Sequence, residues 1–375
     1  MSETMKNAAG VAAGAQAGAS AGGTGPTAGT QAGSPAAGAP LLEVRNLSKR
    51  FPLKHGVIDA IMRRPRRAVN AVTNVSLTLN EGETLGLVGE SGCGKSTLAR
   101  AIIQLYKPSE GTVVFAGAEL TSLQKKELRE SARAIQMIFQ DPYSSLNPRM
   151  TVRTMLREEL LHHKMCEKPE VNQRIKELLE LVGLSPEHAD RLPSAFSGGQ
   201  RQRIGIARAL AVKPKLIIAD EPVSALDVSI QAQIINLLIE LQEKLGLSVL
   251  FISHDLRVVR YISDRVAVMY LGSLVEVAET NELYDHPRHP YTEVLLAAAP
   301  SMDEDAHLTR AAVKGELPSP INVPKGCHFH PRCPFADERC ASEPPELRDL
   351  GGGHIVACHH PLDVTHAERH EVPQA

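Results

Sequence analysis

A stretch of nine residues, 89–97, has the composition and spacing of a phosphate-binding loop. It fits the pattern G-x-x-x-x-G-K-S/T and lies between an apolar run and a segment of helical character. Glycines let consecutive backbone N–H groups point at one phosphate, and the N-terminus of the next helix adds positive potential. We expect Lys95 to contact the β- and γ-phosphates of a nucleotide and the Ser96 hydroxyl to bind Mg2+. The residues expected to contact the nucleotide here are Gly89, Glu90, Ser91, Gly92, Cys93, Gly94, Lys95, Ser96 and Thr97.

Two adjacent acidic residues, Asp220 and Glu221, directly follow the apolar run 216–219. Taken alone, such a pair has a simpler interpretation, which is that it keeps the end of a strand soluble. In a chain with a phosphate-binding loop, we expect Asp220 to hold Mg2+ through water and Glu221 to polarise an attacking water. Because phosphoryl transfer depends mainly on positioning and charge neutralisation, these groups suffice without a covalent nucleophile.

The elements that must position these residues alternate along the chain. Apolar runs at 84–88, 216–219 and 248–252 are typical of buried parallel strands, and 230–245 has the pattern of an amphipathic helix. Strands that alternate with helices predict a doubly wound α/β core. Further β-like runs lie at 41–44 and 69–79, and residues 142–212 are predicted to form a helical insert.

Composition limits the class of protein. Aromatic residues make up 3% of the 375 residues and the formal net charge is -2, which argues against a nucleic-acid partner. The first forty residues include 13 Ala and 9 Gly, with no Leu, Ile or Phe before Leu41, so we expect a disordered tail over residues 1–40 rather than a secretion signal. The sequence contains no run of roughly 18 apolar residues, so no transmembrane helix is predicted.

Residues 196–203, Phe-Ser-Gly-Gly-Gln-Arg-Gln-Arg, closely resemble the signature motif of ABC-type ATPases, with Phe at a position that is more often Leu. The other elements of that family follow the expected order. Gln140 is similar to the Q-loop glutamine, residues 224–227 resemble the D-loop, and His254 resembles the switch histidine. The resemblance implies a P-loop NTPase fold with an ABC-type nucleotide-binding domain, and it implies ATP hydrolysis.

The resemblance also assigns roles to these residues. Lys95, Gln140, Glu221 and His254 are implied to act in hydrolysis, with Gln140 also at Mg2+ and His254 at the γ-phosphate. Further implied nucleotide contacts are Ser197, Gly198, Gly199, Gln200 and Asp227. In this family two ATPase domains face each other, so Ser197 and Gly199 are implied to act on the ATP of a second ATPase subunit. A homodimer and a heterodimer both remain open.

Adenine in such proteins usually stacks on an aromatic residue before the phosphate loop. Phe51 is the single Phe, Tyr or Trp between residues 41 and 88, which makes it the candidate for this role. The alternative is a core or surface phenylalanine without a part in binding. Stacking of this kind is worth about 1–3 kcal/mol.

Narrower features resemble the ATP-binding subunits of oligopeptide/dipeptide importers, and in particular the F-type subunit of dipeptide importers. These features are residues 141–148, residues 289–292, the spacer 52–70 and the Cys-rich tail. The resemblance implies a subunit that lies peripherally at the cytoplasmic face of the inner membrane. Implied partners are two transmembrane permease subunits and, indirectly, an extracytoplasmic solute-binding protein.

Four cysteines cluster near the C-terminus: Cys327, Cys333, Cys340 and Cys358. Disulfides are uncommon in a cytosolic protein, so clustered thiols suggest a metal. The importer resemblance implies a 4Fe–4S cluster on these four residues, which is the number that such clusters need. The spacing lacks the short C-x2-C pairs of zinc ribbons, but zinc remains an alternative because four histidines are near: His328, His330, His354 and His359. Unligated thiols are the third possibility, and Cys93 and Cys166 are expected only to pack.

The predicted organisation has three parts. Residues 1–40 form the tail, residues 41–285 the ATPase domain with its helical subdomain at about 142–212, and residues 286–375 a C-terminal region with the cysteine cluster. The predicted function is to power import of dipeptides or oligopeptides. One alternative is a soluble ABC ATPase that acts on DNA or ribosomes, although those usually carry long coiled-coil inserts or two cassettes. Another is an importer subunit for a different cargo, such as nickel or glutathione.

Overall fold

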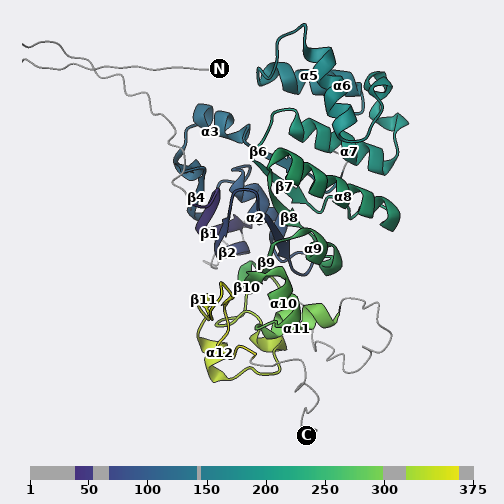
Figure 1. The fold of residues 1–375 in the computed structure, drawn as a ribbon. Helices are drawn as coiled ribbons and strands as arrows, with labels where there is room; N and C mark the ends of the chain where they lie inside the picture. The colour runs from purple at the N-terminus through teal and green to yellow at the C-terminus, as the bar shows by residue number, and fades with distance from the viewer. Residues whose placement is uncertain (1–38, 54–66, 142–144, 299–317, 363–375) are drawn as a thin grey trace, which may run out of the picture. The chain divides into compact units, whose positions relative to one another are not determined.

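A computed structural model of the chain describes residues 39–53, 67–141, 145–298 and 318–362. Its main sheet has eight strands in the order β11-β12-β10-β9-β3-β8-β7-β6 (Figure 1). These strands are β3 (Thr84–Val88), β6 (Ile135–Ile138), β7 (Leu216–Asp220), β8 (Ser248–Ile252), β9 (Arg265–Tyr270), β10 (Ser273–Glu279), β11 (Arg348–Asp349) and β12 (Ile355–Val356).

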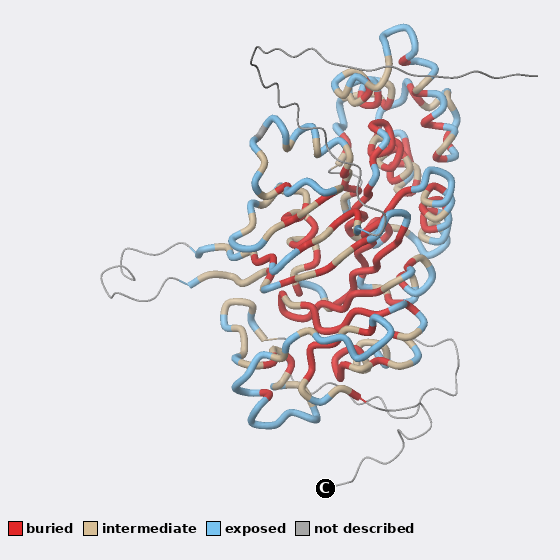
Figure 2. Tube along the Cα trace, turned by 60° about the vertical axis from the view of Figure 1, so that its left-hand side comes forward, coloured by how far each residue is buried: buried red, intermediate tan, exposed pale blue. Residues whose placement is uncertain are grey.

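The five strands from β9 to β6 run parallel, as the alternation of strands and helices predicts. The three apolar runs predicted as buried strands are confirmed as β3, β7 and β8, and every residue of these strands is buried. Both faces of a parallel sheet are covered, so such strands are apolar throughout. Figure 2 shows this buried layer as a band of red through the centre of the molecule.

A second, antiparallel sheet has the order β2-β1-β4-β5. Its strands are β1 (Leu42–Pro52), β2 (Ala68–Leu79), β4 (Glu110–Phe115) and β5 (Ala118–Glu119). The β-like runs at 41–44 and 69–79 are confirmed as parts of β1 and β2, which pair from Leu42 opposite Leu79 to Pro52 opposite Ala68. The alternating pattern predicts each strand but does not specify its partner, so this sheet was not predicted from the sequence.

The segment predicted as a helical insert contains several helices where the structure describes it. The described part of the helical insert contains α5 (Val152–His162), α6 (Val171–Leu181), η2 (Pro186–Asp190), η3 (Pro193–Ala195) and α7 (Gly198–Leu210). Elsewhere in this part of the chain lie α2 (Lys95–Ile102), η1 (Leu120–Ser122), α3 (Lys125–Ala132), α8 (Val228–Leu245) and α9 (Leu256–Ile262). The apolar face of α6 is buried, and Gly183 follows the helix with φ +70°, a conformation that favours glycine and ends the helix.

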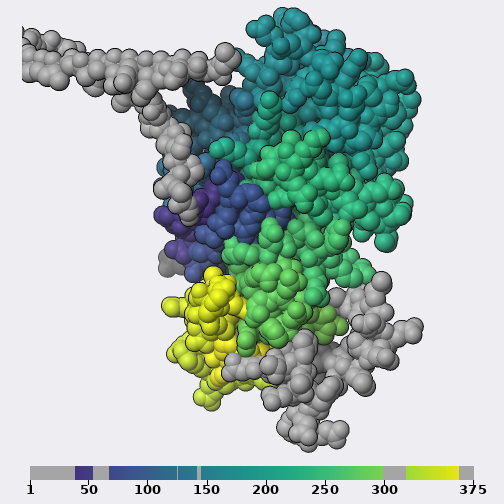
Figure 3. All heavy atoms as spheres, in the orientation of Figure 1, coloured from purple at the N-terminus to yellow at the C-terminus, as the bar shows by residue number. Residues whose placement is uncertain are grey.

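The C-terminal region shares the main sheet and the buried core. It follows α10 (Thr280–Asp285) and contains α11 (Pro290–Ala297), η5 (His330–Arg332) and α12 (Glu338–Ser342), together with β11 and β12. Strand β12 pairs with β10, with Glu276 opposite Val356, and Phe329 is buried in the same hydrophobic cluster as β8 and β9. In Figure 3 these yellow residues lie directly beside the green residues that precede them.

A buried carboxylate joins the C-terminal segments. Glu276 in β10 is fully buried, and it accepts hydrogen bonds from the backbone N–H of Arg288 at 2.6 Å and of His289 at 3.0 Å. The ring of His354 lies 2.7 Å away through Nε2. A buried charge is tolerated when it is paired and hydrogen-bonded in this way. These contacts tie residues 288–289 and 354 to the sheet.

Two expectations fall on residues that the structure does not describe. The tail predicted over 1–40 lies outside the described residues except for its last two positions, and most of the spacer 52–70 lies outside them as well. Among the described helices, none combines the length and apolar character needed to cross a membrane.

Candidate functional site

The phosphate-binding loop connects β3 to α2 as its pattern predicts. Two of its glycines are required by the backbone. Gly94 has φ +110° and Gly89 has φ +152°, and a Cβ atom at either position would lie 2.1 Å from a backbone oxygen, that of Ala71 or Met269 respectively. No side chain fits there, because real Cβ contacts are never so short. The loop therefore curves tightly at the N-terminus of α2, where backbone N–H groups and the helix dipole favour an anion.

Lys95 is the first residue of α2 and is only 4% exposed. Its ammonium group donates hydrogen bonds to the backbone oxygens of Gly89 at 2.7 Å and Glu90 at 3.1 Å, which hold it under the loop. Cys93 is buried, with its sulfur 3.9 Å from the ammonium, and burial raises the pKa of this thiol. The loop opens on a cleft of about 350 Å³. Its lining residues are Phe51, Val69, Ala71, Ser91, Gly92, Gly94, Lys95, Ser96, Thr97, Gln140, Glu221 and Pro320.

Ser96 lines this cleft and contacts Asp220, a buried residue that is not part of the lining. The Ser96 hydroxyl donates a 2.7 Å hydrogen bond to Oδ1 of Asp220, and Asp220 is completely buried. Burial raises the pKa of this carboxyl, while the hydrogen bond from Ser96 and the charge of Arg100, 3.7 Å from Oδ2, oppose the rise. Among the described residues, no group makes a hydrogen bond to Oδ2. A buried carboxylate oxygen without a hydrogen bond beside a hydroxyl oxygen fits a hard, oxygen-preferring cation such as Mg2+.

Glu221 meets two other expected site residues at the ends of parallel strands. Gln140 follows β6, Glu221 follows β7 and His254 follows β8, and parallel pairing brings these three ends to one edge of the sheet. The Gln140 amide donates a 2.8 Å hydrogen bond to Glu221 Oε2, and His254 Nδ1 lies 3.4 Å from Oε1. Glu221 has φ +47°, a strained conformation for a non-glycine residue, of the kind that clusters at functional sites.

The signature residues lie at the N-terminus of α7, away from this cleft. Ser197 caps the helix by accepting the N–H of Gln200 at 3.3 Å, and the Gln200 side chain accepts the N–H of Ser197 at 3.1 Å. A Cβ atom on Gly199 would lie 2.5 Å from Ile230, so glycine permits close packing against α8. None of residues 197–200, nor Asp227 before α8, is among the residues that line the phosphate-loop cleft.

Phe51, near the end of β1, lies at the edge of the cleft. Its ring meets that of Tyr106 edge-on, with centroids 5.3 Å apart, and the ammonium of Lys49 lies 4.9 Å from the ring centroid. Phe51 is half-buried rather than enclosed in the core, and it lines the cleft. This placement agrees with a binding role, while the contact with adenine stays a prediction.

The four C-terminal cysteines line one small cavity of about 10 Å³. Burial raises the pKa of all four thiols, to about 11 for Cys333 and about 12 for Cys358. Neighbouring cysteines contribute to the rise at Cys327, Cys333 and Cys358. Of the four histidines named with them, His330 and His359 line this cavity. The other two do not: His328 lines a different cleft, and His354 bonds Glu276. The sequence interpretation omitted His360, which also lines the cavity.

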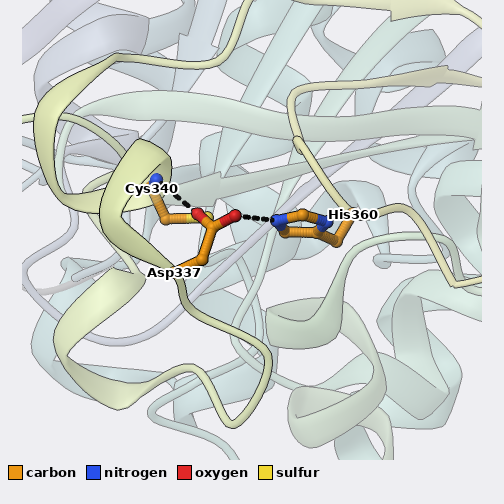
Figure 4. A group of neighbouring side chains, drawn as sticks. All are labelled: Asp337, Cys340 and His360. Carbon is orange, nitrogen blue, oxygen red and sulfur yellow. Dashed lines mark hydrogen bonds and ion pairs between the residues drawn. The ribbon is translucent and has the colours of Figure 1, made fainter.

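One looser group of possible metal ligands includes two residues that line this cavity, Cys340 and His360. Figure 4 shows Asp337, Cys340 and His360, whose ligand atoms lie within 4.8 Å of one another. Asp337 is already occupied, because it accepts the N–H of Cys340 at 2.8 Å and lies 2.9 Å from His360. These bonds lower its pKa to about 2. The group is accounted for as the N-cap of α12 with an ion pair.

Sequence reasoning missed two residues that touch the phosphate loop. Tyr291 in α11 accepts the backbone N–H of Glu90 at 3.0 Å, and Arg332 makes an ion pair with the Glu90 carboxylate at 3.1 Å. Tyr291 belongs to residues 289–292. This segment carries part of the importer resemblance, but the sequence assigned no role to it. No local pattern indicates either contact, because more than 200 residues separate the partners.

Comparisons with known proteins agree with this geometry. The family model "ABC transporter" matches residues 72–224, and the model "Oligopeptide/dipeptide transporter, C-terminal region" matches residues 275–340. The chain is 54% identical over 322 residues to the oligopeptide transport ATP-binding protein AppF of Bacillus subtilis, covering 85% of this chain and 97% of that protein. It is 51% identical to the probable peptide ABC transporter ATP-binding protein y4tS of Sinorhizobium fredii, covering 85% and 89%.

A solved structure supports the fold. The ATP-binding cassette MJ0796, solved as a dimer in a post-hydrolysis state with ADP and Pi, has a TM-score of 0.55 and 31% identity to this chain. The match covers 64% of this chain and 98% of that one. The long match at over half identity, the two family models and the shared fold agree. The chain belongs to the ABC transporter family of ATPases, in its oligopeptide/dipeptide transporter group.

Proposed function

We propose that this chain binds and hydrolyses ATP to power a membrane importer of dipeptides or oligopeptides. The observation that carries the proposal is one cleft where the phosphate loop meets Gln140 and Glu221 at the ends of parallel strands, with Asp220 hydrogen-bonded to Ser96 of the loop. The match of residues 275–340 to the C-terminal region of oligopeptide/dipeptide transporters supports the cargo. A soluble ATPase that acts on DNA or ribosomes is not favoured, because the matched relatives are named as peptide transport proteins.

The nucleotide lies along the cleft from Phe51 to the phosphate loop. Phe51 stacks on adenine at the edge of the cleft, and the backbone N–H groups of residues 89–97 cradle the phosphates. Lys95 contacts the β- and γ-phosphates, and its position under the loop supports this role. Ser96, Gln140 and Asp220 hold Mg2+, which when bound neutralises phosphate charge. Gln140 uses Nε2 on Glu221, which leaves its amide oxygen for the metal.

Glu221 is the general base of hydrolysis. It accepts a proton from water while the water oxygen attacks the γ-phosphorus and the bond to the bridging oxygen of ADP breaks. Gln140 and His254 hold its carboxylate from two sides. The His254 side chain is more than half exposed, so its ring remains accessible to the γ-phosphate.

The active unit contains two ATPase subunits. The signature residues 197–200 and Asp227 are absent from the lining of the cleft formed by the described residues, so in the proposed dimer they contact ATP on a second subunit. The N-terminus of α7 suits an anion, because its first backbone N–H groups have no partner within the helix. The second subunit is either another copy of this chain or a related ATPase.

The permease docks beside the Q-loop. A groove of about 240 Å³ is bordered by Phe139, the residue before Gln140, and by Leu105, which is 60% exposed. Most of its lining is apolar, and its polar members are Ser131, Gln136, Glu159 and Arg208. Its other apolar lining residues are Ile103, Leu120, Leu128, Ala132, Ile135 and Met137. An apolar helix end from a transmembrane subunit fits such a groove. Phe139 is adjacent to Gln140 in the chain, and Gln140 is hydrogen-bonded to Glu221. A permease that contacts Phe139 is therefore one residue away from the hydrolytic site.

Cys327, Cys333, Cys340 and Cys358 hold a 4Fe–4S cluster, with zinc as the alternative occupant. Their convergence on one cavity supports a shared metal group. Because their pKa values are raised, the free thiols keep their protons. Metal binding would convert the thiols to thiolates and release these protons. The cluster would cross-link four separate segments of the C-terminal region.

The proposed organisation assigns residues 41–285 to the ATPase domain, 142–212 to its helical subdomain and 286–375 to the C-terminal region, after a tail at 1–40. The subunit lies peripherally at the cytoplasmic face of the inner membrane. There it binds two permease subunits, which receive peptide from an extracytoplasmic solute-binding protein.

Uptake by cells that lack the gene tests the proposal. A deletion strain is complemented with the wild-type chain or with Lys95→Ala, and the uptake of labelled dipeptide, nickel and glutathione is measured. Wild type should restore dipeptide uptake and Lys95→Ala should not, because the phosphates lose their buried cation. Restoration of only nickel or glutathione uptake would replace the proposed cargo, and copurification with ribosomes or DNA in place of a permease would refute the importer.

A further inference from the structure

The C-terminal region holds the second residue of the phosphate loop through a two-pronged ion pair. Arg332, the last residue of η5, approaches Glu90 with both terminal nitrogens, each 3.1 Å from a different carboxylate oxygen. The Arg332 side chain is 9% exposed and that of Glu90 is 26% exposed. A bidentate arginine–carboxylate pair with little exposure is strong and fixed in direction.

A cluster of three buried aromatic rings holds this arginine in place. The Tyr270 hydroxyl accepts a hydrogen bond from Arg332 at 3.3 Å. The ring of Tyr270 lies 4.6 Å from that of Tyr291 and 5.3 Å from that of Phe329 between centroids. Tyr270 belongs to β9, beside the strand that leads into the phosphate loop. The guanidinium is therefore anchored on the main sheet as well as on the C-terminal region.

Tyr291 makes a second contact with the same loop residue. Its hydroxyl accepts the backbone N–H of Glu90 at 3.0 Å, while the backbone oxygen of Glu90 accepts the Lys95 ammonium at 3.1 Å. The backbone N–H, the backbone oxygen and the carboxylate of Glu90 are therefore all held by contacts. The backbone oxygen of Glu90 also accepts the N–H of Cys93 at 3.2 Å. The loop and its helix thus hold the oxygen, whereas the C-terminal region holds the N–H and the carboxylate.

We infer that Arg332 and Tyr291 are positioning residues for the phosphate loop, so that the C-terminal region sets part of the chain's affinity for ATP. The inference rests on the proposed ATP binding at this loop. It gives the C-terminal region a task within the ATPase site itself, in addition to any role in transport.

Electrostatics gives the expected direction of the effect. Glu90 places a negative charge one residue into a loop that must receive the negative phosphates of ATP, and Arg332 neutralises that charge. Without the guanidinium, an unpaired and largely buried carboxylate would repel the phosphates or pull the loop towards water. Loss of Arg332 should therefore weaken nucleotide binding, and removal of the Glu90 charge should restore it.

Coupling between two sites is reciprocal, which gives an independent readout. If Arg332 strengthens nucleotide binding, then nucleotide must stabilise the segment that carries Arg332. Residues 327–333 include η5 and two of the four clustered cysteines, so their backbone should exchange hydrogen more slowly when ATP is bound.

The test measures binding of a fluorescent ATP analogue, methylanthraniloyl-ATP with Mg2+, to the full-length chain. Four proteins are compared with wild type: Arg332→Met, Arg332→Lys, Glu90→Gln with Arg332→Met, and Arg339→Met. Arg339 is the matched control, because it forms an ion pair with Glu343 at 3.0 Å on the surface of the same region. Thermal unfolding without nucleotide verifies that each variant is folded.

Arg332→Met should bind the analogue about tenfold more weakly, within the range of ordinary coupling between sites. Its KM for ATP should rise in parallel, with kcat at saturation little changed, because binding rather than chemistry is affected. Arg332→Lys should recover part of the affinity and the double variant most of it, while Arg339→Met should match wild type.

Unchanged affinity in a folded Arg332→Met protein overturns the inference. Should that variant not fold, hydrogen exchange of the wild-type chain decides, and a segment 327–333 that nucleotide leaves unprotected also overturns it. The two proposals fail differently. Wild type that binds no analogue refutes the proposed function, whereas wild type and Arg332→Met that bind equally refute only the role of Arg332.

Discussion

The side-chain amide of Gln140 donates a 2.8 Å hydrogen bond to Oε2 of Glu221, although 81 residues separate them in sequence. His254 lies 3.4 Å from the other carboxylate oxygen. The carboxylate is therefore oriented from two neighbouring strand ends while its backbone is held in the left-handed region. This arrangement resembles a prepositioned base more than a surface acid, because each contact limits where the carboxylate points.

Replacement of the proposed base should separate binding from hydrolysis. Glu221→Gln keeps the shape and the hydrogen bond with Gln140 but cannot accept a proton, so phosphate release should fall by about 100-fold or more. Binding of methylanthraniloyl-ATP should stay close to that of wild type. Glu240→Gln, which changes an exposed glutamate on α8, is the control for the change of charge. Normal turnover in Glu221→Gln would remove this residue as the base.

Loss of the ring at the edge of the cleft should weaken ATP binding. Stacking contributes about 1–3 kcal/mol, so Phe51→Ala should lower the affinity between about 5- and 150-fold. Phe51→Tyr should retain most of the affinity, because the ring face is kept. Tyr261→Ala provides the control at a 65% exposed aromatic residue remote from the cleft. Equal affinities for Phe51→Ala and wild type would assign this ring to packing alone.

A charge in the groove beside the Q-loop should uncouple the ATPase from its permease. Leu105→Asp places a carboxylate where an apolar helix end is proposed to dock, so recovery of permease on the tagged subunit should fall by about tenfold or more. ATP hydrolysis by the isolated subunit should not change. Leu245→Asp, at a 44% exposed leucine on α8 outside the groove, is the control. Undiminished recovery with Leu105→Asp would place the docking surface elsewhere.

Anaerobic purification should yield a coloured protein that contains iron and sulfide. Cys333→Ser should lose both the visible absorbance and the bound iron, because one of four ligands is removed. Cys166→Ser, in the helical segment, should keep them. A colourless wild-type protein that contains zinc would exclude the cluster and leave the zinc alternative, which elemental analysis of the same sample reports directly.

Acid should destabilise the fold through His289. Burial lowers the pKa of its fully buried ring to about 4. Between that value and the ordinary pKa of about 6.5, the unfolded chain binds a proton that the folded chain does not. The free energy of unfolding should therefore fall as pH drops from 6.5 to 4, by up to about 1.4 kcal/mol per pH unit.

The His289→Asn variant isolates this contribution. His289 Nδ1 accepts the N–H of Tyr291 at 3.0 Å, and the asparagine oxygen can replace that cap while removing the titration. Urea unfolding at several pH values should show a shallower fall for His289→Asn than for wild type. His162→Gln, at an exposed histidine, should behave as wild type. The same pH dependence in His289→Asn and wild type would show that another group causes the acid sensitivity.

The sequence determined the local machinery. Glycines at 89 and 94, a lysine and a hydroxyl predict a phosphate loop, because their backbone requirements involve only neighbouring residues. The apolar runs now seen as β3, β7 and β8 predict the parallel core for the same reason. His254 was named from its resemblance to the switch histidine, and parallel strands explain why it lies beside Glu221, because they place the residues that follow them at one edge.

Tertiary structure alone decided which distant segments meet. No pattern indicates that β1 pairs with β2 and β4, that β12 joins the main sheet, or that Arg332 reaches Glu90 across 242 residues. It also decided which of the four histidines lie near the cysteines. His330 and His359 line the cavity, whereas His354 contacts Glu276 instead. Periodicity reports which face of an element is buried, but the partner of that face depends on the packing of the whole chain.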